Sequence, residues 1–206
     1  MARPRTFSLD DATDRAMQVF WRQGYDEAGL SELLDAMGIV RGSFYKAFGS
    51  KQALFLRVLE RYDAQTVSSG VALLEDETIP GRDRIALFFE SGLAAARAGD
   101  RRGCLLCNTA SGPVLEDEAV REAVRAQMDR LAAGFEAALA AAGADEATRR
   151  GEAQALLMRY VGLQVLGRGG ADPELLAEAL PSVAGSSLTG SDPAGSDLAG
   201  AGPTLQ

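Results

Sequence analysis

Histidine is absent from this chain of 206 residues. The absence removes the side chain that most often acts as a general base and as a transition-metal ligand, so most hydrolase triads and zinc sites are excluded. The chain holds two cysteines, too few for a disulfide framework, which favours a reducing, cytoplasmic environment. No apolar run approaches the length of a membrane span, and the first residues lack the apolar stretch of a secretory signal. We therefore expect a cytoplasmic protein with no metal, no cofactor and no membrane partner.

Basic residues are fewer than acidic ones, and the formal net charge is −8. The imbalance is uneven along the chain. Residues 1–62 contain nine Lys and Arg against eight Asp and Glu, a net charge of +1, whereas the remainder has a net charge of −9. We expect the acidic part to repel nucleic acid, so any contact with DNA is left to a small basic face within the first part.

Patterns typical of β-strands are also missing, and apolar residues recur instead at helical spacing. Ser8 and Ser50 are suited to cap helix N-termini, Gly24 to end the first helix, and Pro173 to open a short late helix. The sequence therefore predicts an all-α protein with a three-helix head over residues 1–49 and a helical body over residues 50–180. A Gly/Ser/Pro-rich tail over residues 181–206 is expected to be disordered. Within the body, helices are expected at about 50–62, 80–98, 104–111, 117–142 and 145–166, and from 172.

Residues 29–48 contain the most specific pattern, two short amphipathic helices around a tight turn. Apolar residues recur from Leu30 to Met37 at helical spacing, and Gly38 follows where a helix ends most easily. In the next helix Phe44 and Phe48 face inward. This pattern is typical of a helix-turn-helix whose second helix enters the DNA major groove. An ordinary helical hairpin is the alternative, but it does not explain the polar face formed by Arg41, Ser43, Tyr45 and Lys46.

These residues resemble the TetR family of transcriptional regulators. The resemblance covers about residues 8–62 and is most specific in the run G-S-F-Y-x-x-F-x-S-K-x-x-L-F, from Gly42 to Phe55. It implies a DNA-binding domain over residues 1–49, a ligand-binding and dimerisation domain over residues 50–180, and a homodimer on a palindromic double-stranded operator. The other matching residues are Phe20, Gly24, Tyr25, Leu33, Met37, Gly38 and Ile39.

The resemblance also implies a set of DNA-binding residues. Independent physical reasons agree with it, because glycine permits close backbone approach, helix N-termini favour anions, and Lys and Arg give salt-dependent affinity for phosphates. The implied roles are phosphate contact for Arg41, Lys46 and Lys51, approach to the bases for Gly42 and Ser43, and contact of Tyr45 with phosphate or a thymine methyl group.

The chain departs from the family pattern at two helix starts. Val40 precedes the second helix of the motif and Gly29 the first, where the family commonly has a capping hydroxyl, and a lost cap costs about 0.5–2 kcal/mol. The resemblance therefore does not imply the phosphate contact that such a hydroxyl usually makes. Near the N-terminus, Arg3 and Arg5 are candidates for an arm in the minor groove, with a disordered solvated terminus as the alternative.

The two cysteines lie in the segment R-G-C-L-L-C-N. As free thiols among leucines, Cys104 and Cys107 fit a buried core. Cys104 also begins an expected helix after Arg101 and Arg102, where the helix dipole and the cations would lower its pKa. The R-G-C-L run resembles a TetR subgroup with members that respond to electrophiles or oxidants, which makes both cysteines sensor candidates. A disulfide between them is disfavoured, because residues three apart in a helix hold their Cβ atoms about 5–6 Å apart.

The sequence thus predicts a homodimeric regulator, a repressor released by a small-molecule or electrophile effector or by modification of Cys104. We expect no catalytic residues; the alternatives are a cysteine-dependent enzyme that uses Cys104 and a helical interaction module without DNA binding. The apolar stripe from Ala153 to Val165 is expected inside the body or, by the resemblance, at the dimer interface. Candidates for the lining of an effector cavity are Phe88, Phe89, Leu106, Met128, Phe135, Met158 and Tyr160.

Overall fold

The protein, described by a computed structural model over residues 8–178 and residue 180, is helical in every regular element of that range. None of the described helices is long and apolar enough to cross a membrane. The expected arm at Arg3 and Arg5 and the expected tail over 181–206 lie outside the described residues. In chain order the elements are α1 Leu9–Gln23, α2 Leu30–Met37, α3 Arg41–Phe48, α4 Lys51–Tyr62, the π-helical turn η1 Asp63–Val67, α5 Ser68–Glu75, α6 Gly81–Arg97, α7 Leu105–Ala110, the 3-10 turn η2 Pro113–Glu116, α8 Glu118–Ala141, α9 Glu146–Arg168 and α10 Pro173–Glu178.

Helix ends follow the expected local chemistry. Ser8 and Ser50 cap α1 and α4, each accepting a hydrogen bond from a backbone N–H three residues ahead, at 3.2 and 3.0 Å. Gly29 and Val40 precede α2 and α3 without any side-chain cap, as their residue types predict. These two short helices are therefore held by packing on their neighbours rather than by their own ends.

The head, which we define as α1–α3 within residues 8–49, packs on α4 through aromatic side chains. Phe20 of α1 and Phe55 of α4 are both buried and meet edge to face, with ring centroids 4.9 Å apart. Burying one such ring contributes about 1.5–3 kcal/mol. Beside them, the Arg61 guanidinium donates to both Asp14 carboxylate oxygens at 2.8 and 2.7 Å, which joins α4 to α1. The first helix of the body thus carries the head.

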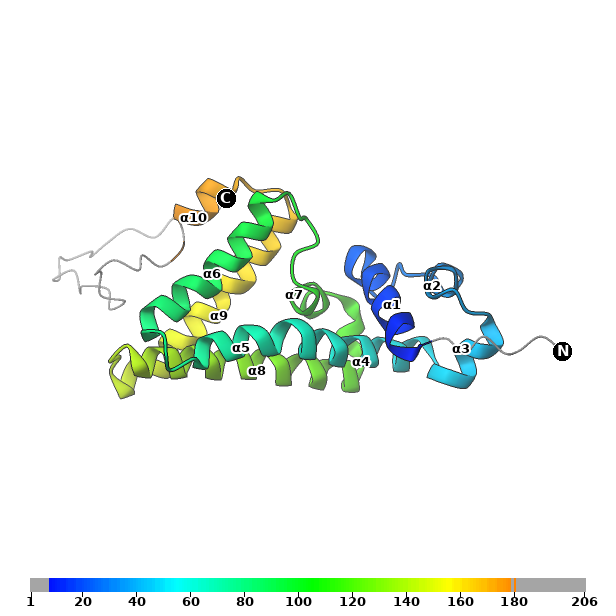
Figure 1. The fold of residues 1–206 in the computed structure, drawn as a ribbon, viewed down its shortest axis with the longest axis horizontal. Coiled ribbons are helices and arrows are strands. Elements are labelled where there is room, and N and C mark those ends of the chain that lie inside the picture. Colours follow the sequence, from blue (N-terminus) through cyan, green and yellow to red (C-terminus); the bar gives the residue numbers. More distant parts are fainter. Residues whose placement is uncertain (1–7, 179, 181–206) are drawn as a thin grey trace, which may run out of the picture.

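The body, which we define as α4–α10, is a helical bundle elongated away from the head (Figure 1). α4, η1 and α5 follow one another along α8, and α6 and α9 cross them as a second pair. The continuation of α4 through η1 into α5 is a feature for which the sequence analysis made no prediction. Val67, Val71 and Leu74 explain it, because they form a buried apolar row that faces the bundle.

Candidate DNA-binding surface and thiol cluster

The α2–α3 pair forms the expected helix-turn-helix. Gly38 has φ +68°, and its N–H donates to the carbonyls at the end of α2, which ends that helix in the left-handed conformation. Phe44 and Phe48 anchor α3, with 0% and 6% of their surface exposed. The second helix is therefore held firmly on its inner side, and its outer side is free to meet a partner.

The outer side of α3 carries the residues predicted to bind DNA. Arg41, Gly42, Tyr45 and Lys46 are exposed and Ser43 is half-buried. Tyr45 alone exposes 48% of its surface, a large fraction for an aromatic residue. Among the described residues, no hydrogen bond or ion pair occupies the side chains of Arg41, Tyr45 or Lys46, so both charges are available to a partner. The structure thus brings these side chains together on one face, as the sequence predicted.

Gly42 has open space around it in the protein. A Cβ atom added there would have nothing within 4 Å, and the backbone of this helical residue lies in the ordinary negative-φ region. Neither packing nor backbone conformation in the free chain requires glycine at this position. The predicted close approach of Gly42 to DNA bases stays a prediction.

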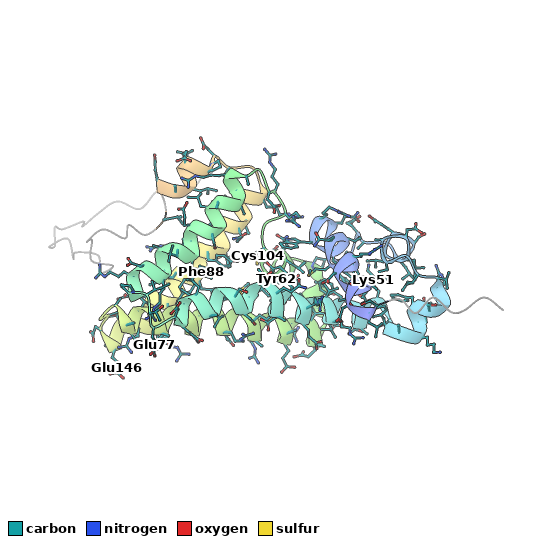
Figure 2. All side chains as sticks on the ribbon, in the orientation of Figure 1. Lys51, Tyr62, Glu77, Phe88, Cys104 and Glu146 are labelled. Atoms are coloured by element: carbon teal, nitrogen blue, oxygen red, sulfur yellow. The ribbon has the colours of Figure 1, made fainter. Side chains whose placement is uncertain are left out.

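Lys51, at the start of α4, lies apart from the α3 face (Figure 2). Its Nζ lies 4.5 Å from the centroid of the Tyr25 ring and donates to the Asp26 carbonyl at 3.4 Å. Burial lowers the pKa of Lys51 from its usual value, although the Asp26 carboxylate opposes the shift. In this structure Lys51 therefore fastens the α1–α2 connection to α4, and its predicted phosphate contact stays a prediction.

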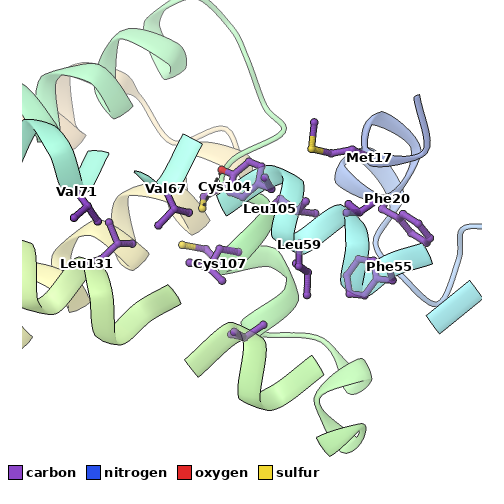
Figure 3. Close-up of a cluster of buried hydrophobic side chains, with 14 of the residues drawn as sticks. Met17, Phe20, Phe55, Leu59, Val67, Val71, Cys104, Leu105, Cys107 and Leu131 are labelled. Carbon is purple, nitrogen blue, oxygen red and sulfur yellow. Dashed lines mark hydrogen bonds between the residues drawn. The ribbon is translucent and has the colours of Figure 1, made fainter. Parts of the chain in front are cut away.

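The two cysteines, at the start of α7 and within it, lie in a cluster of buried hydrophobic side chains (Figure 3). Cys104 is the N-cap residue of α7, with 3% of its surface exposed, and Cys107 lies inside that helix with 1% exposed. The Tyr62 hydroxyl donates to Cys104 Sγ at 3.3 Å. Both thiols are free. Because Cys104 precedes α7 rather than lying within it, the helix spacing that disfavoured a disulfide does not describe this pair.

The cause of the perturbed pKa at Cys104 differs from the one expected. A hydrogen bond from the Cys107 thiol lowers the pKa of Cys104 to about 6, with further hydrogen bonds from the Tyr160 and Tyr62 hydroxyls, while burial opposes the shift. The same contact and burial raise the pKa of Cys107. Arg102 was expected to act on the thiol, but its guanidinium is paired with Asp100 instead. Tyr62 was predicted only as the end of a helix, and no sequence signal showed a thiol as its partner.

The residues proposed to line an effector cavity do not form one shared wall. Phe88 and Phe135 are buried and pack edge to face at 5.0 Å, whereas Met158 exposes 67% of its surface, which corrects its assignment to a cavity. A cavity of about 350 Å³ lies instead between the head and α7. No sequence pattern indicated its lining, which includes Phe20 and Tyr25 from the head and Phe55, Leu105, Asn108, Val114 and Arg168 from the body.

The described residues thus form a helix-turn-helix head on a helical body, and the second helix of the motif exposes cations that have no partner among them. This arrangement is that of a helix-turn-helix protein. Residues 12–58 match the family described as bacterial regulatory proteins, tetR family. A cysteine variant of the TetR family transcriptional regulator CifR, solved with 26-base-pair operator DNA, aligns with a TM-score of 0.76 at 32% identity, over 86% of this chain and 95% of that one. The chain belongs to the TetR family.

Two curated repressors of Escherichia coli strain K12 are also similar. BdcR is 32% identical over 120 residues, which is 58% of this chain and 59% of BdcR. NemR is 33% identical over 126 residues, which is 61% of each chain. The chain thus spans about three fifths of the length of either repressor.

Proposed function

We propose that the protein is a homodimeric, DNA-binding transcriptional repressor whose α3 helices enter successive major grooves of a palindromic operator. The observation that carries this proposal is the α3 face, where Arg41 and Lys46 flank the exposed Tyr45 without any partner among the described side chains. Arg61, by contrast, is neutralised by Asp14 and Asp10. Arg41 and Lys46 are thus free to bind phosphate on the helix that fits a groove.

Dimerisation is supported by an apolar face on α9. Met158, Val165 and Leu166 expose 67%, 46% and 55% of their surfaces and lie seven and eight residues apart, on one side of the helix. Such a row costs free energy in water unless it is covered. A second copy of the chain covers it with the same residues through a two-fold axis, and a two-fold dimer matches a palindromic operator.

The proposed release mechanism uses either a small effector or modification of Cys104. The cavity between the head and α7 is lined by residues of the head and of α7, and Leu105 of its wall is the residue after Cys104. An adduct on Cys104 lies next to Leu105 of that wall, and a ligand in the cavity contacts the head and the body at once. If it binds more tightly when the two α3 helices are spread apart, it shifts the population toward a form that no longer fits the operator.

Operator binding tests the proposal directly. Fluorescence anisotropy of the purified protein with DNA from beside its own gene is expected to show binding that weakens steeply with salt, because counterions are released from the phosphates. A mixed competitor DNA serves as the control for specificity. If the protein binds none of the DNA fragments in a salt-dependent way, its proposed function as a DNA-binding repressor is refuted. Turnover of a thiol-reactive substrate would favour the cysteine-dependent enzyme instead. Membership of a regulator family favours DNA binding, and such a function implies a cytoplasmic location, where bacterial DNA lies.

A further inference from the structure

The junction between head and body contains the only tryptophan of the chain. Trp21 lies near the end of α1, and its indole Nε1 donates to the Gly103 carbonyl at 2.9 Å, across 82 residues of sequence. The Arg102 guanidinium lies over the indole, 4.4 Å from the ring centroid. On another side the indole meets the Tyr62 ring edge to face, with centroids 5.1 Å apart. One side chain of the head thus contacts both α4 and the α6–α7 connection.

Arg102 strengthens this contact by tying its own loop to α1. Its guanidinium donates to both carboxylate oxygens of Asp100, at 3.0 and 2.6 Å, and to Gln18 Oε1 at 2.9 Å. The ion pair with Arg102 lowers the pKa of Asp100. Because a planar guanidinium with fixed partners stacks well on an indole, Arg102 holds Trp21 in one orientation.

Arg168, at the end of α9, closes the junction from the other side. Its guanidinium donates to the backbone carbonyls of Trp21, Arg22 and Arg102, at 3.3, 3.2 and 2.9 Å. The first two carbonyls belong to the last turn of α1, where carbonyls have no partner within their own helix. A single cation of the body therefore fixes both the end of α1 and the loop on which Trp21 rests.

Gly103 has little room to move within this arrangement. Its φ is +65°, and an added Cβ atom would lie 3.1 Å from the Gln164 carbonyl oxygen and 3.3 Å from Arg168 Cβ. The residue is thus lodged against α9 on one side and hydrogen-bonded to Trp21 through its carbonyl. That carbonyl belongs to the peptide bond that leads into Cys104.

Two short routes therefore connect Cys104 with Trp21. The first is the Gly103–Cys104 peptide group itself, and the second is Tyr62, whose hydroxyl contacts Cys104 Sγ and whose ring contacts the indole. Cys104 and Tyr62 are 3% and 1% exposed, so the space around the sulfur is filled. Since packed interiors hold few voids, an adduct on Cys104 displaces Tyr62, Gly103 or both.

We propose that Trp21 is the positioning residue through which a change at Cys104 reaches the DNA-binding head. In the unmodified protein, the hydrogen bond to Gly103, the Arg102 stack and the Tyr62 contact hold α1, and with it α3, at one angle to the body. A displaced Tyr62 or Gly103 releases the indole and lets the head turn. The inference rests on the proposed function in that Cys104 is the responsive thiol.

The first test uses Trp21 as its own reporter. N-ethylmaleimide is added to the full chain carrying Cys107→Ser, so that one thiol remains, and mass spectrometry establishes complete labelling. The Cys104 thiolate adds across the maleimide double bond, and a proton from water completes the adduct; local opening of the fold admits the reagent. Labelling is expected to shift the fluorescence emission of Trp21 to longer wavelength as the indole gains water contact. A control that carries Cys104→Ala together with Cys107→Ser should show no shift. A fully labelled protein with unchanged emission would overturn the proposal.

The second test compares operator affinity before and after labelling. We expect labelling to weaken operator binding about tenfold or more in the parent. Trp21→Phe already lacks the hydrogen bond to Gly103, so it should bind more weakly than the parent when unlabelled and lose most of the further response to labelling. Tyr62→Phe, which keeps the ring but loses the hydroxyl, is the second variant in case Trp21→Phe unfolds, and circular dichroism checks both. Arg97→Gln is the control: it breaks surface ion pairs with Glu90 and Glu174 away from the junction. Its operator affinity should fall on labelling by as much as that of the parent.

The outcomes separate the two proposals. Equal responses in the parent and in both folded variants would overturn the role of Trp21 while leaving the regulator intact. Lack of operator binding by the unlabelled parent would refute the proposed function, and the emission shift would still decide whether the junction senses Cys104.

Discussion

Lys46→Ala should weaken operator binding through loss of phosphate contact alone. Lys46 is exposed on the outer side of α3, without any partner among the described side chains, so its removal leaves the buried anchors Phe44 and Phe48 unchanged. A dimer carries two copies. Each phosphate contact contributes about 0.9 to the slope of log affinity against log salt, so losing two reduces the slope by about 1.8. At about 0.1 M salt this corresponds to roughly 60-fold weaker binding, or about 2.4 kcal/mol.

Fluorescence anisotropy titrations across a series of salt concentrations measure this slope. Arg82→Ala is the matched control, because Arg82 is also exposed and loses the same charge, but it begins α6 at the end of the body away from the head (Figure 1). Its slope should equal that of the parent protein. A slope for Lys46→Ala that matches the Arg82→Ala slope would refute the assignment of α3 to the groove.

Three further predictions concern other parts of the molecule. Gly42→Ala should raise stability toward unfolding by up to about 1 kcal/mol, yet cost about 1–3 kcal/mol of operator affinity if the added methyl meets the bases; unchanged affinity would contradict close approach at this position. The rate of Cys104 alkylation should level off above its pKa of about 6, rather than near the ordinary value of 9.0, and a rate that still climbs steeply at pH 8 would contradict the lowered pKa. Because the pKa in the folded protein is the lower one, the contribution of the Cys104 thiolate to the free energy of unfolding is complete above pH 9 and is lost as pH falls through 6. Met158→Glu should yield monomers in sedimentation velocity, because an unpaired carboxylate in an apolar interface costs several kcal/mol. Leu175→Glu, at a similarly exposed residue on α10, should leave the dimer intact, and a dimeric Met158→Glu would contradict the α9 interface.

Local sequence patterns were enough to predict the elements of the head. The spacing of Leu33, Met37, Phe44 and Phe48 requires two short helices with buried inner faces, and Gly38 provides the turn between them. The outward group around Tyr45 follows from the same period of 3.6 residues. These features depend on neighbours within one or two helical turns, which is why the sequence reveals them.

The body was harder to predict, because its decisive contacts join residues far apart in the chain. The π-helical turn at Asp63–Val67, which continues α4 into α5, depends on packing against α8. Cys104 has a lowered pKa through Cys107, Tyr160 and Tyr62 rather than through the adjacent arginines. Nothing in the local pattern distinguishes these tyrosines from other core residues.

By itself, the order of residues determined an all-α chain, a helix-turn-helix with a cationic outer face, and a short apolar helix with one thiol at its start and one within it, because each is a matter of local periodicity and side-chain chemistry. Only the tertiary structure decided that Lys51 packs on Tyr25, that Met158 faces outward, and that Trp21 joins the head to the thiol cluster. Those outcomes depend on which helices become neighbours in space, and burial and hydrogen-bond partners are defined only once the bundle has closed.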